Sequence, residues 1–299
     1  MKFLLTGIGG FAGSLIAQQL LKHNYKIIGV YRSEIPKKRL ALIEHENCLL
    51  IQKDLSKSFE FNDKVDGIIH IAGKSAPNGV DMNEYICDNI LATKNLISYA
   101  INSRIKKFIN FSSVSVYGDI TTDIVDEDTP IINPSAYGIS KLSGELLLKD
   151  VKEEIASVSL RLSGILGNGE GECWLAKVAS KIMNNQDVEY FNRDAFFNNV
   201  AHIADIARFI MEWFNDNYKS SDIVNFACTS PMKLQSVLKT LINIMGSKSQ
   251  LIVKTSKANS FFISAKKLEN EFKFVSSSTI DILNSFASEI MQLQREKYS

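Results

Sequence analysis

The sequence opens on a glycine-rich turn between an apolar segment and a helical one. Residues 2–5 read Lys-Phe-Leu-Leu, a run too short for anything but a buried strand. Residues 14–23 repeat leucine and isoleucine at helical spacing, and residues 26–31 form a second apolar run. The pattern predicts a strand, a tight turn, a helix and a second strand, which together make one βαβ unit.

The turn contains four glycines within seven positions, Gly7, Gly9, Gly10 and Gly13. Glycine lets a ligand approach the backbone closely, and the helix start offers N–H groups and the positive end of a dipole to a diphosphate. A dinucleotide is therefore the natural ligand. The spacing fits Gly7-x-Gly9-x-x-Ala12 or Gly7-x-x-Gly10-x-x-Gly13, and a turn that only packs helix on strand is the alternative to both.

Composition excludes several classes of protein. With 34 basic and 33 acidic residues among 299, no global charge favours nucleic acid. The N-terminus has no basic leader, and no apolar run reaches eighteen residues, so we expect no membrane segment and a cytoplasmic location. The four cysteines are isolated, so we expect reduced thiols and no metal site. They are Cys48, Cys87, Cys173 and Cys228.

Strands alternate with helices through the first half of the chain, which predicts an α/β fold with a doubly wound parallel sheet, the Rossmann arrangement. Further strands are predicted at 48–52, 67–73, 108–111 and 155–166, helices at 83–102 and 135–151, and a loop at 32–39. We expect a Rossmann domain over 1–166 and a smaller C-terminal α/β substrate-binding lid over 167–299. Residues 200–228 are expected to return to the main sheet.

Tyr137 and Lys141 lie four residues apart on a predicted helix and therefore share one face. A free tyrosine has a pKa of about 10, and a neighbouring ammonium favours the phenolate. We therefore expect a lowered pKa that lets Tyr137 do acid–base work. An ordinary solvated helix pair is the alternative for these two residues taken alone.

Eight segments, in this order, resemble the extended short-chain dehydrogenase/reductases, the group of nucleotide-sugar epimerases, dehydratases and reductases. They are Thr6-Gly7-x-x-Gly10-Phe11-x-Gly13, Asp54-Leu55, His70-Ile71-Ala72-Gly73, Asn89 in Asn-Ile-Leu-Ala-Thr, Ser112-Ser113 to Tyr117-Gly118, Tyr137-x-x-x-Lys141, Arg161-Leu162-Ser163, and His202-Ile203-Ala204-Asp205. The resemblance covers essentially the whole chain and favours the Gly7, Gly10, Gly13 spacing.

The resemblance implies roles for particular residues. Tyr137 is the general acid or base, Lys141 holds the nicotinamide ribose, and Ser113 hydrogen-bonds the substrate oxygen. Asp54 and Leu55 would lie beside the adenine. The implied cofactor-binding residues are Gly7, Gly10, Phe11, Gly13, Arg32, Asp54, Leu55, Ala72, Gly73, Asn89, Tyr137 and Lys141. The family also implies a homodimer through the helices at 83–102 and 135–151.

The chain departs from the family where the second strand ends. Members that use NAD usually carry an acidic residue there, whereas this chain has Tyr31 followed by Arg32. An arginine pairs well with a 2′-phosphate, so we expect NADP(H), with NAD(H) bound without a carboxylate as the alternative. Dissociable NADPH in turn favours net reduction.

The preferred activity is therefore reduction of a keto group on a nucleotide-linked deoxysugar, with Tyr137 delivering the proton. The alternatives are a nucleotide-sugar 4-epimerase and a non-catalytic NADP(H)-sensing regulator. Dehydration is disfavoured, because Val114 and Ser115 stand where dehydratases carry an acidic pair.

The substrate side of the resemblance is incomplete. Family members often have a diphosphate-binding arginine seven residues before the aspartate of His-x-x-Asp, and this chain has Asn198 there. Arg193 or Lys177 could replace it, or either could be an ordinary surface charge. The missing arginine also leaves open a substrate other than a nucleotide sugar. The expected substrate-binding residues are Ser113, Ser163, Lys177, Arg193 and Asn198.

Overall fold

The computed structural model describes residues 1–58, 61, 63–76, 80–216, 218, 220–255 and 259–298. The chain forms two compact units, each made of three segments. Unit 1 comprises Met1–Asp119, Pro130–Arg161 and Ile206–Val224, and unit 2 comprises Ile120–Thr129, Leu162–Asp205 and Asn225–Ser299.

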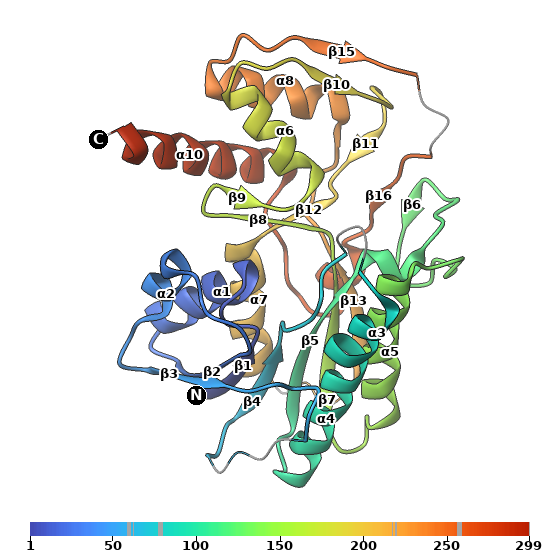
Figure 1. The fold of residues 1–299 in the computed structure, drawn as a ribbon. Helices are drawn as coiled ribbons and strands as arrows, with labels where there is room; N and C mark the ends of the chain where they lie inside the picture. The colour runs from blue at the N-terminus through green and yellow to red at the C-terminus, as the bar shows by residue number, and fades with distance from the viewer. Residues whose placement is uncertain are drawn as a thin grey trace. The chain divides into compact units, whose positions relative to one another are not determined.

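A seven-stranded sheet forms the centre of unit 1, in the order β13-β7-β5-β4-β1-β2-β3 (Figure 1). The pairs of β1 with β2 and β4, β2 with β3, and β4 with β5 are all parallel. Strand order therefore reverses direction between β1 and β4, as in a doubly wound fold. The strands are β1 Lys2–Thr6, β2 Lys26–Tyr31, β3 Cys48–Gln52, β4 Gly67–His70, β5 Lys107–Ser113, β7 Ala156–Leu162 and β13 Asp222–Phe226.

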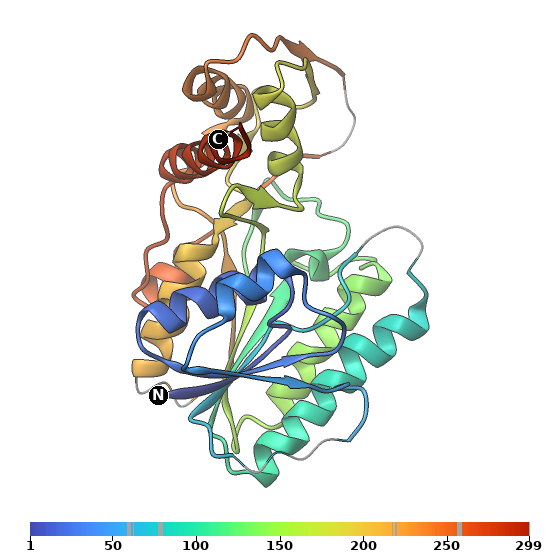
Figure 2. The ribbon, with the colours of Figure 1, turned by 60° about the vertical axis from the view of Figure 1, so that its left-hand side comes forward.

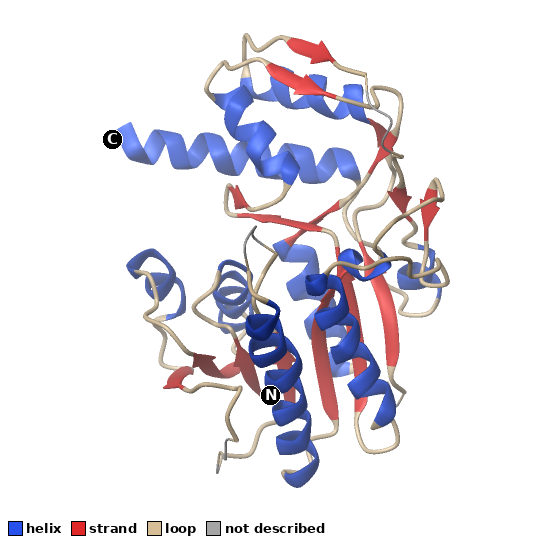
Figure 3. Ribbon diagram, turned by 45° about the vertical axis from the view of Figure 1, so that its right-hand side comes forward, coloured by secondary structure: helices blue, strands red, loops and turns tan. Residues whose placement is uncertain are grey.

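Helices cover both faces of this sheet, and the predicted α/β class is confirmed (Figures 2 and 3). One face carries α1 and α7, and the other carries α4 and α5 (Figure 1). The central strands are rich in apolar residues because both of their faces are buried. The helices are α1 Phe11–Lys22, α2 Lys37–Ile43, α3 Met82–Tyr85, the π-helix η1 Ile86–Leu91, α4 Ala92–Asn102, the 3₁₀ helix η2 Val114–Tyr117, α5 Ala136–Asp150 and α7 Ile203–Asn215.

Two sequence expectations differ from the structure. The predicted loop over 32–39 ends early, because α2 begins at Lys37 and Arg39 is buried with its guanidinium over the Phe11 ring. The predicted strand over 155–166 is divided at Ser163, which separates β7 from β8, Gly164–Gly167. The amide of Gly164 donates to the carbonyl of Asn199 instead of continuing the main sheet.

Unit 2 has its own apolar core between α6, α8 and α10. Unit 2 also contains a three-stranded sheet in the order β12-β8-β9 and the strand pairs β10 with β15, β11 with β14, and β16 with β6. The elements are β6 Ile124–Val125, β8 Gly164–Gly167, β9 Glu170–Gly171, α6 Trp174–Met183, β10 Val188–Tyr190, β11 Phe196–Phe197, β12 Val200–His202, β14 Met232–Lys233, α8 Leu234–Met245, β15 Leu251–Val253, β16 Phe262–Ile263, α9 Lys266–Asn270 and α10 Thr279–Tyr298.

Among the described residues, no helix has the length and apolar character needed to cross a bilayer.

Candidate functional site

The glycine turn joins β1 to α1, and its glycines have different tasks. Gly7 has a φ of +72°, and a Cβ there would lie 2.7 Å from the amide nitrogen of Ala72. A Cβ on Gly13 would lie 2.1 Å from the carbonyl oxygen of Gly7. Gly10 is exposed, and a Cβ there would meet only that oxygen, at 3.3 Å. Gly7 and Gly13 therefore allow close packing, while Gly10 leaves the helix start open.

The start of α1 fits the diphosphate of a dinucleotide. Within residues 1–58, no side chain caps this helix at Gly10, and its first turn has no acidic residue. Free N–H groups and the positive end of the helix dipole therefore point toward the space above Gly10. An acidic residue or a side-chain cap would compete with a phosphate, and this helix has neither.

A buried histidine network fixes the neighbouring ends of β1 and β4. The amide of Ala72 donates to Thr6 Oγ1 at 3.2 Å, and Thr6 Oγ1 lies 2.8 Å from His70 Nδ1. His70 Nε2 lies 2.9 Å from Thr93 Oγ1, which donates to the carbonyl of Asn89. Because the Thr93 hydroxyl donates to Asn89, its oxygen accepts from Nε2–H of His70. Nδ1 is then unprotonated and accepts from the Thr6 hydroxyl, so the proton of His70 is assigned to Nε2. Burial lowers the pKa of His70 to about 3, so the ring is neutral.

Asn89 connects the end of β4 with α5. Its Oδ1 accepts from the amide of Lys74 at 2.6 Å, and its Nδ2 donates to Ser140 Oγ at 2.7 Å. Only 2% of Asn89 is exposed. A Cβ on Gly73 would lie 2.9 Å from Asn89 Oδ1 and 3.2 Å from Lys141 Nζ. The exposed backbone of Gly73 therefore lies directly beside the predicted catalytic lysine.

The structure brings Ser113, Tyr137 and Lys141 together at the carboxyl end of β5. Tyr137 and Lys141 lie in α5, whose start is capped by Ser135 Oγ. Ser113 Oγ accepts from the amide of Ser115 at 3.1 Å and donates to Ser115 Oγ at 3.2 Å, and Tyr137 lies near enough for the Ser113 side chain to lower its pKa. Lys141 Nζ donates to the carbonyl of Phe111 at 2.8 Å.

The expected direction of the Tyr137 pKa is wrong. Burial raises this pKa above its ordinary value, and the nearby Ser113 side chain counteracts burial only in part. The Lys141 ammonium does not reverse the shift, because it is directed at the Phe111 carbonyl. Burial also lowers the pKa of Lys141 to about 8, while the nearby carboxylate of Glu145 opposes that change. Lys141 is therefore the group of this pair that titrates near neutral pH.

A buried ion pair links α5 to β7. Arg161 donates to both carboxylate oxygens of Glu145, with its Nη2 2.8 Å from Oε2. Ser112 Oγ donates to Glu145 Oε1 at 2.5 Å, and the Arg161 guanidinium lies 4.8 Å above the Tyr117 ring centre. Ser112 therefore belongs to this network, whereas its neighbour Ser113 bonds to Ser115.

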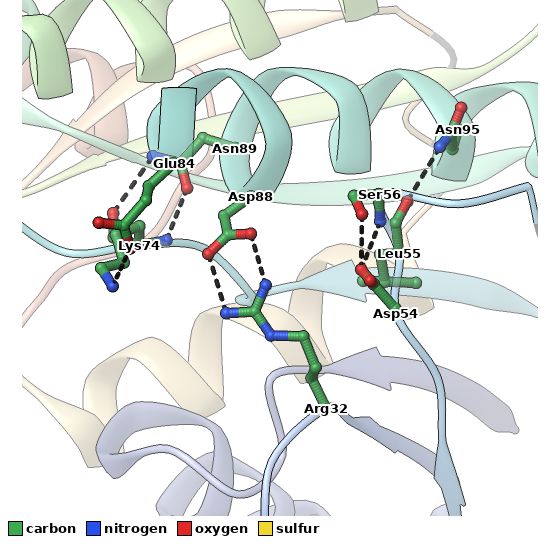
Figure 4. Close-up of polar contacts among 9 residues, drawn as sticks. All are labelled: Arg32, Asp54, Leu55, Ser56, Lys74, Glu84, Asp88, Asn89 and Asn95. Carbon is green, nitrogen blue, oxygen red and sulfur yellow. Dashed lines mark hydrogen bonds and ion pairs between the residues drawn. The ribbon is translucent and has the colours of Figure 1, made fainter. Parts of the chain in front are cut away.

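Figure 4 shows Asp54 and Leu55, which were expected to lie beside the adenine, together with Arg32 and the charged residues near it. Asp54 Oδ1 accepts from the amide and hydroxyl of Ser56, and these bonds lower its pKa. Leu55 packs its side chain into the core, and its carbonyl accepts from Asn95. Arg32 points toward Asp88 in η1 and donates to both carboxylate oxygens, at 2.5 and 2.9 Å. The guanidinium expected to hold a 2′-phosphate is thus paired with a carboxylate of the chain itself.

The four expected substrate residues beyond Ser113 belong to unit 2. Ser163 is 8% exposed and donates to the carbonyl of Phe226. Asn198 is 1% exposed, and its Nδ2 donates to the carbonyls of Cys228 and Ile263. Both N–H donors of Asn198 are therefore used inside the unit, which argues against the expected substrate contact.

Lys177 and Arg193 remain available as substrate-binding cations. Lys177 lies exposed on α6, and Arg193 is exposed with only a loose ion pair to Asp194, at 3.7 Å. Neither side chain is buried.

The sequence interpretation gave no role to Asp88, Glu145 or the imidazole of His70. Glu145 had a detectable signal, because it lies one helical turn after Lys141, within an apolar stripe. Asp88 had none, since its partner Arg32 is 56 residues away in the sequence.

Comparison with known proteins places the chain in one family. The model of the NAD dependent epimerase/dehydratase family matches residues 3–227. Protein CapI of Staphylococcus aureus is 25% identical over 285 residues, which cover 84% of this chain and 85% of that protein. A putative UDP-glucose 4-epimerase of Methanocaldococcus jannaschii is 29% identical over 265 residues, covering 81% and 83%.

Solved structures share the fold over nearly the full length. UDP-glucuronic acid 4-epimerase from Bacillus cereus, in complex with NAD, has a TM-score of 0.81 at 22% identity and covers 98% of this chain and 99% of its own. MoeE5, in complex with UDP-glucuronic acid and NAD, has a TM-score of 0.81 at 19% identity and covers 99% and 100%. The match to the family model over most of the chain confirms the resemblance drawn from the motifs, and this chain belongs to the NAD-dependent epimerase/dehydratase family of the extended short-chain dehydrogenase/reductases.

Proposed function

We propose that this protein is an NAD-dependent epimerase that inverts C4 of a nucleotide-linked sugar. The observation that carries the proposal is the grouping of Ser113, Tyr137 and Lys141 beside Gly73, next to an open helix start. Relatives that cover more than four fifths of the chain, and solved structures of the same fold, are named as 4-epimerases of UDP-sugars.

The chain's own residues would handle the proton of the reaction. Tyr137 Oη accepts the proton of the C4 hydroxyl during oxidation and returns it to the C4 oxygen during reduction. Ser113 Oγ, near Tyr137, would align that oxygen and stabilise the charge that develops on it. When bound, the nicotinamide supplies the acceptor for the hydride that leaves C4 and later returns to its opposite face.

The expectation of net reduction receives no support. It depended on Arg32 holding a 2′-phosphate and thereby selecting NADPH, and Arg32 is paired with Asp88. Relatives named in complexes contain NAD. The epimerase alternative is therefore preferred to the ketoreductase.

Chromatography of the sugar nucleotide tests the proposal. The full chain is incubated with NAD and either UDP-glucose or UDP-glucuronic acid. We expect conversion to the C4 epimer without net accumulation of NADH. Net NADPH oxidation on a keto sugar nucleotide, or dinucleotide binding without any turnover, would overturn it.

Removing the Tyr137 hydroxyl tests the role of that residue. Tyr137→Phe should lower the rate of epimerisation at least about 100-fold, since the proton acceptor is lost. Tyr85→Phe is the matched control, because the Tyr85 ring lies 6.0 Å from that of Tyr137 and its hydroxyl donates to the Ser75 carbonyl. Equal rates for the two variants would contradict the assigned role.

A further inference from the structure

The ion pair between Arg32 and Asp88 joins two elements that are far apart in the sequence. Arg32 directly follows β2, and Asp88 lies in the π-helix η1 (Figure 4). Arg32 Nη1 lies 2.5 Å from Asp88 Oδ1, and Nη2 lies 2.9 Å from Oδ2. Such a two-bonded arrangement fixes the plane of the guanidinium as well as its position.

The surroundings keep Arg32 in this orientation. The hydrogen bonds with Asp88 raise the pKa of Arg32, and the carboxylates of Asp54 and Glu84 act in the same direction. Gln52 Nε2 donates to the backbone carbonyl of Arg32 at 2.9 Å. On the other side of the pair, Asp88 precedes Asn89, which is held by Lys74 and Ser140. Both ends of the ion pair are therefore anchored.

The pair lies where a dinucleotide would present its adenosine ribose. The amides of Gly7 and Ile8, in the glycine turn, both contact the carbonyl of Val30 near the end of β2. In open α/β sheets, the residues after this strand distinguish a ribose hydroxyl from a 2′-phosphate. Arg39, a second cation of this region, lies over the Phe11 ring.

Resting on the proposed use of a nicotinamide dinucleotide, we propose that Asp88 sets the cofactor selectivity of this protein by neutralising Arg32. A 2′-phosphate would have to displace Asp88 from the guanidinium and would then face the carboxylates of Asp88 and Asp54. A ribose hydroxyl leaves the ion pair intact. Asp88 thus excludes NADP.

Calorimetric titration of the full chain with NAD and NADP, without sugar, tests the proposal. The wild type should bind NAD at least about tenfold more tightly than NADP. Asp88→Asn releases Arg32 and should tighten NADP binding about tenfold, with little change for NAD. The double variant Asp88→Asn with Arg32→Gln should lose that gain, because the released cation is its source.

A distant ion pair supplies the control for net charge. Asp63→Asn removes one carboxylate from the pair of Asp63 with Lys2, at the amino end of β1. It should change neither affinity by more than about twofold, since screening weakens charge effects at that distance. The proposal is overturned if the wild type prefers NADP, or if Asp88→Asn leaves the NAD to NADP ratio unchanged. An unchanged ratio for Asp88→Asn overturns this inference alone and leaves the epimerase proposal standing, whereas a wild-type preference for NADP would count against both. A failed epimerase assay leaves this inference standing, because no turnover is measured.

Discussion

Two buried polar networks flank Lys141, and they differ in charge. The histidine network, formed by Thr6, His70, Ala72, Thr93 and Asn89, contains only neutral groups. The ion-pair network, formed by Ser112, Glu145, Arg161 and Tyr117, buries a cation and an anion.

The difference shows how the protein keeps a buried lysine charged. The carboxylate of Glu145 raises the pKa of Lys141 against the effect of burial. A protonated His70 would act as a like charge near Lys141, and its pKa of about 3 prevents this at ordinary pH. The ion-pair network therefore places an opposite charge near Lys141, while the histidine network stays neutral beside it.

Breaking the ion-pair network should have the largest effect on stability. Glu145→Leu leaves Arg161 buried without its carboxylate, and we expect a loss of about 3–5 kcal/mol in the free energy of unfolding. Urea denaturation measures this loss. The double variant Glu145→Leu with Arg161→Met should recover most of it, because no unpaired charge remains. A loss below about 1 kcal/mol in the single variant would contradict the buried ion pair.

Removing Lys141 should act in the opposite direction. Its pKa is about 8 in the folded protein and 10.5 in the unfolded chain, so below pH 8 the folded state bears the full cost of the buried ammonium. Lys141→Met should therefore raise the free energy of unfolding by about 2–3 kcal/mol at pH 7.

The advantage of Lys141→Met should shrink between pH 8 and 10.5, where the unfolded chain binds more protons than the folded one. Urea denaturation of the wild type and the variant across this range gives the difference at each pH. A difference that does not change with pH would show that the ammonium is not buried at a cost.

Opening the histidine network should have the smallest effect. His70→Leu removes one hydrogen-bond partner from each of the Thr6 and Thr93 hydroxyls, and we expect a loss of about 1–2 kcal/mol at pH 7. Wild-type stability falls as pH drops from 6.5 toward 3, because the unfolded chain binds a proton that buried His70 does not. The difference between the two proteins should therefore narrow over that range in thermal denaturation. His23→Leu, on the exposed end of α1, is the control and should behave as wild type.

The sequence carried the fold class and the catalytic motif because both depend on local patterns. Apolar strands alternate with amphipathic helices, and the glycines of the first turn and the spacing of Tyr137 and Lys141 are visible within single elements. The same reasoning missed the break in the strand predicted over 155–166. The split between β7 and β8 at Ser163 depends on hydrogen bonds to strands that come much later in the chain.

Electrostatic expectations failed where long-range contacts decide them. Arg32 alone indicated a 2′-phosphate, and only the fold reveals that Asp88 pairs with it. Lys141 alone indicated a lowered pKa for Tyr137, yet burial raises it. Asn198, at the position where family members often have an arginine, was expected to bind substrate, and its side chain bonds to two backbone carbonyls. In each case the charge or dipole was visible in the sequence, but its partner was not.

The π-helix η1 has a consequence for how this family member can change. In this π-helix, Asp88 pairs with Arg32, which directly follows β2, while Asn89 donates to Ser140 in α5. Deleting one residue from Ile86–Leu91 would rotate both side chains together. A point substitution of Asp88 would therefore leave Asn89 and its hydrogen bonds in place. A change in the length of this turn would move both side chains, and would thus alter the proposed cofactor selectivity and the candidate site in a single step.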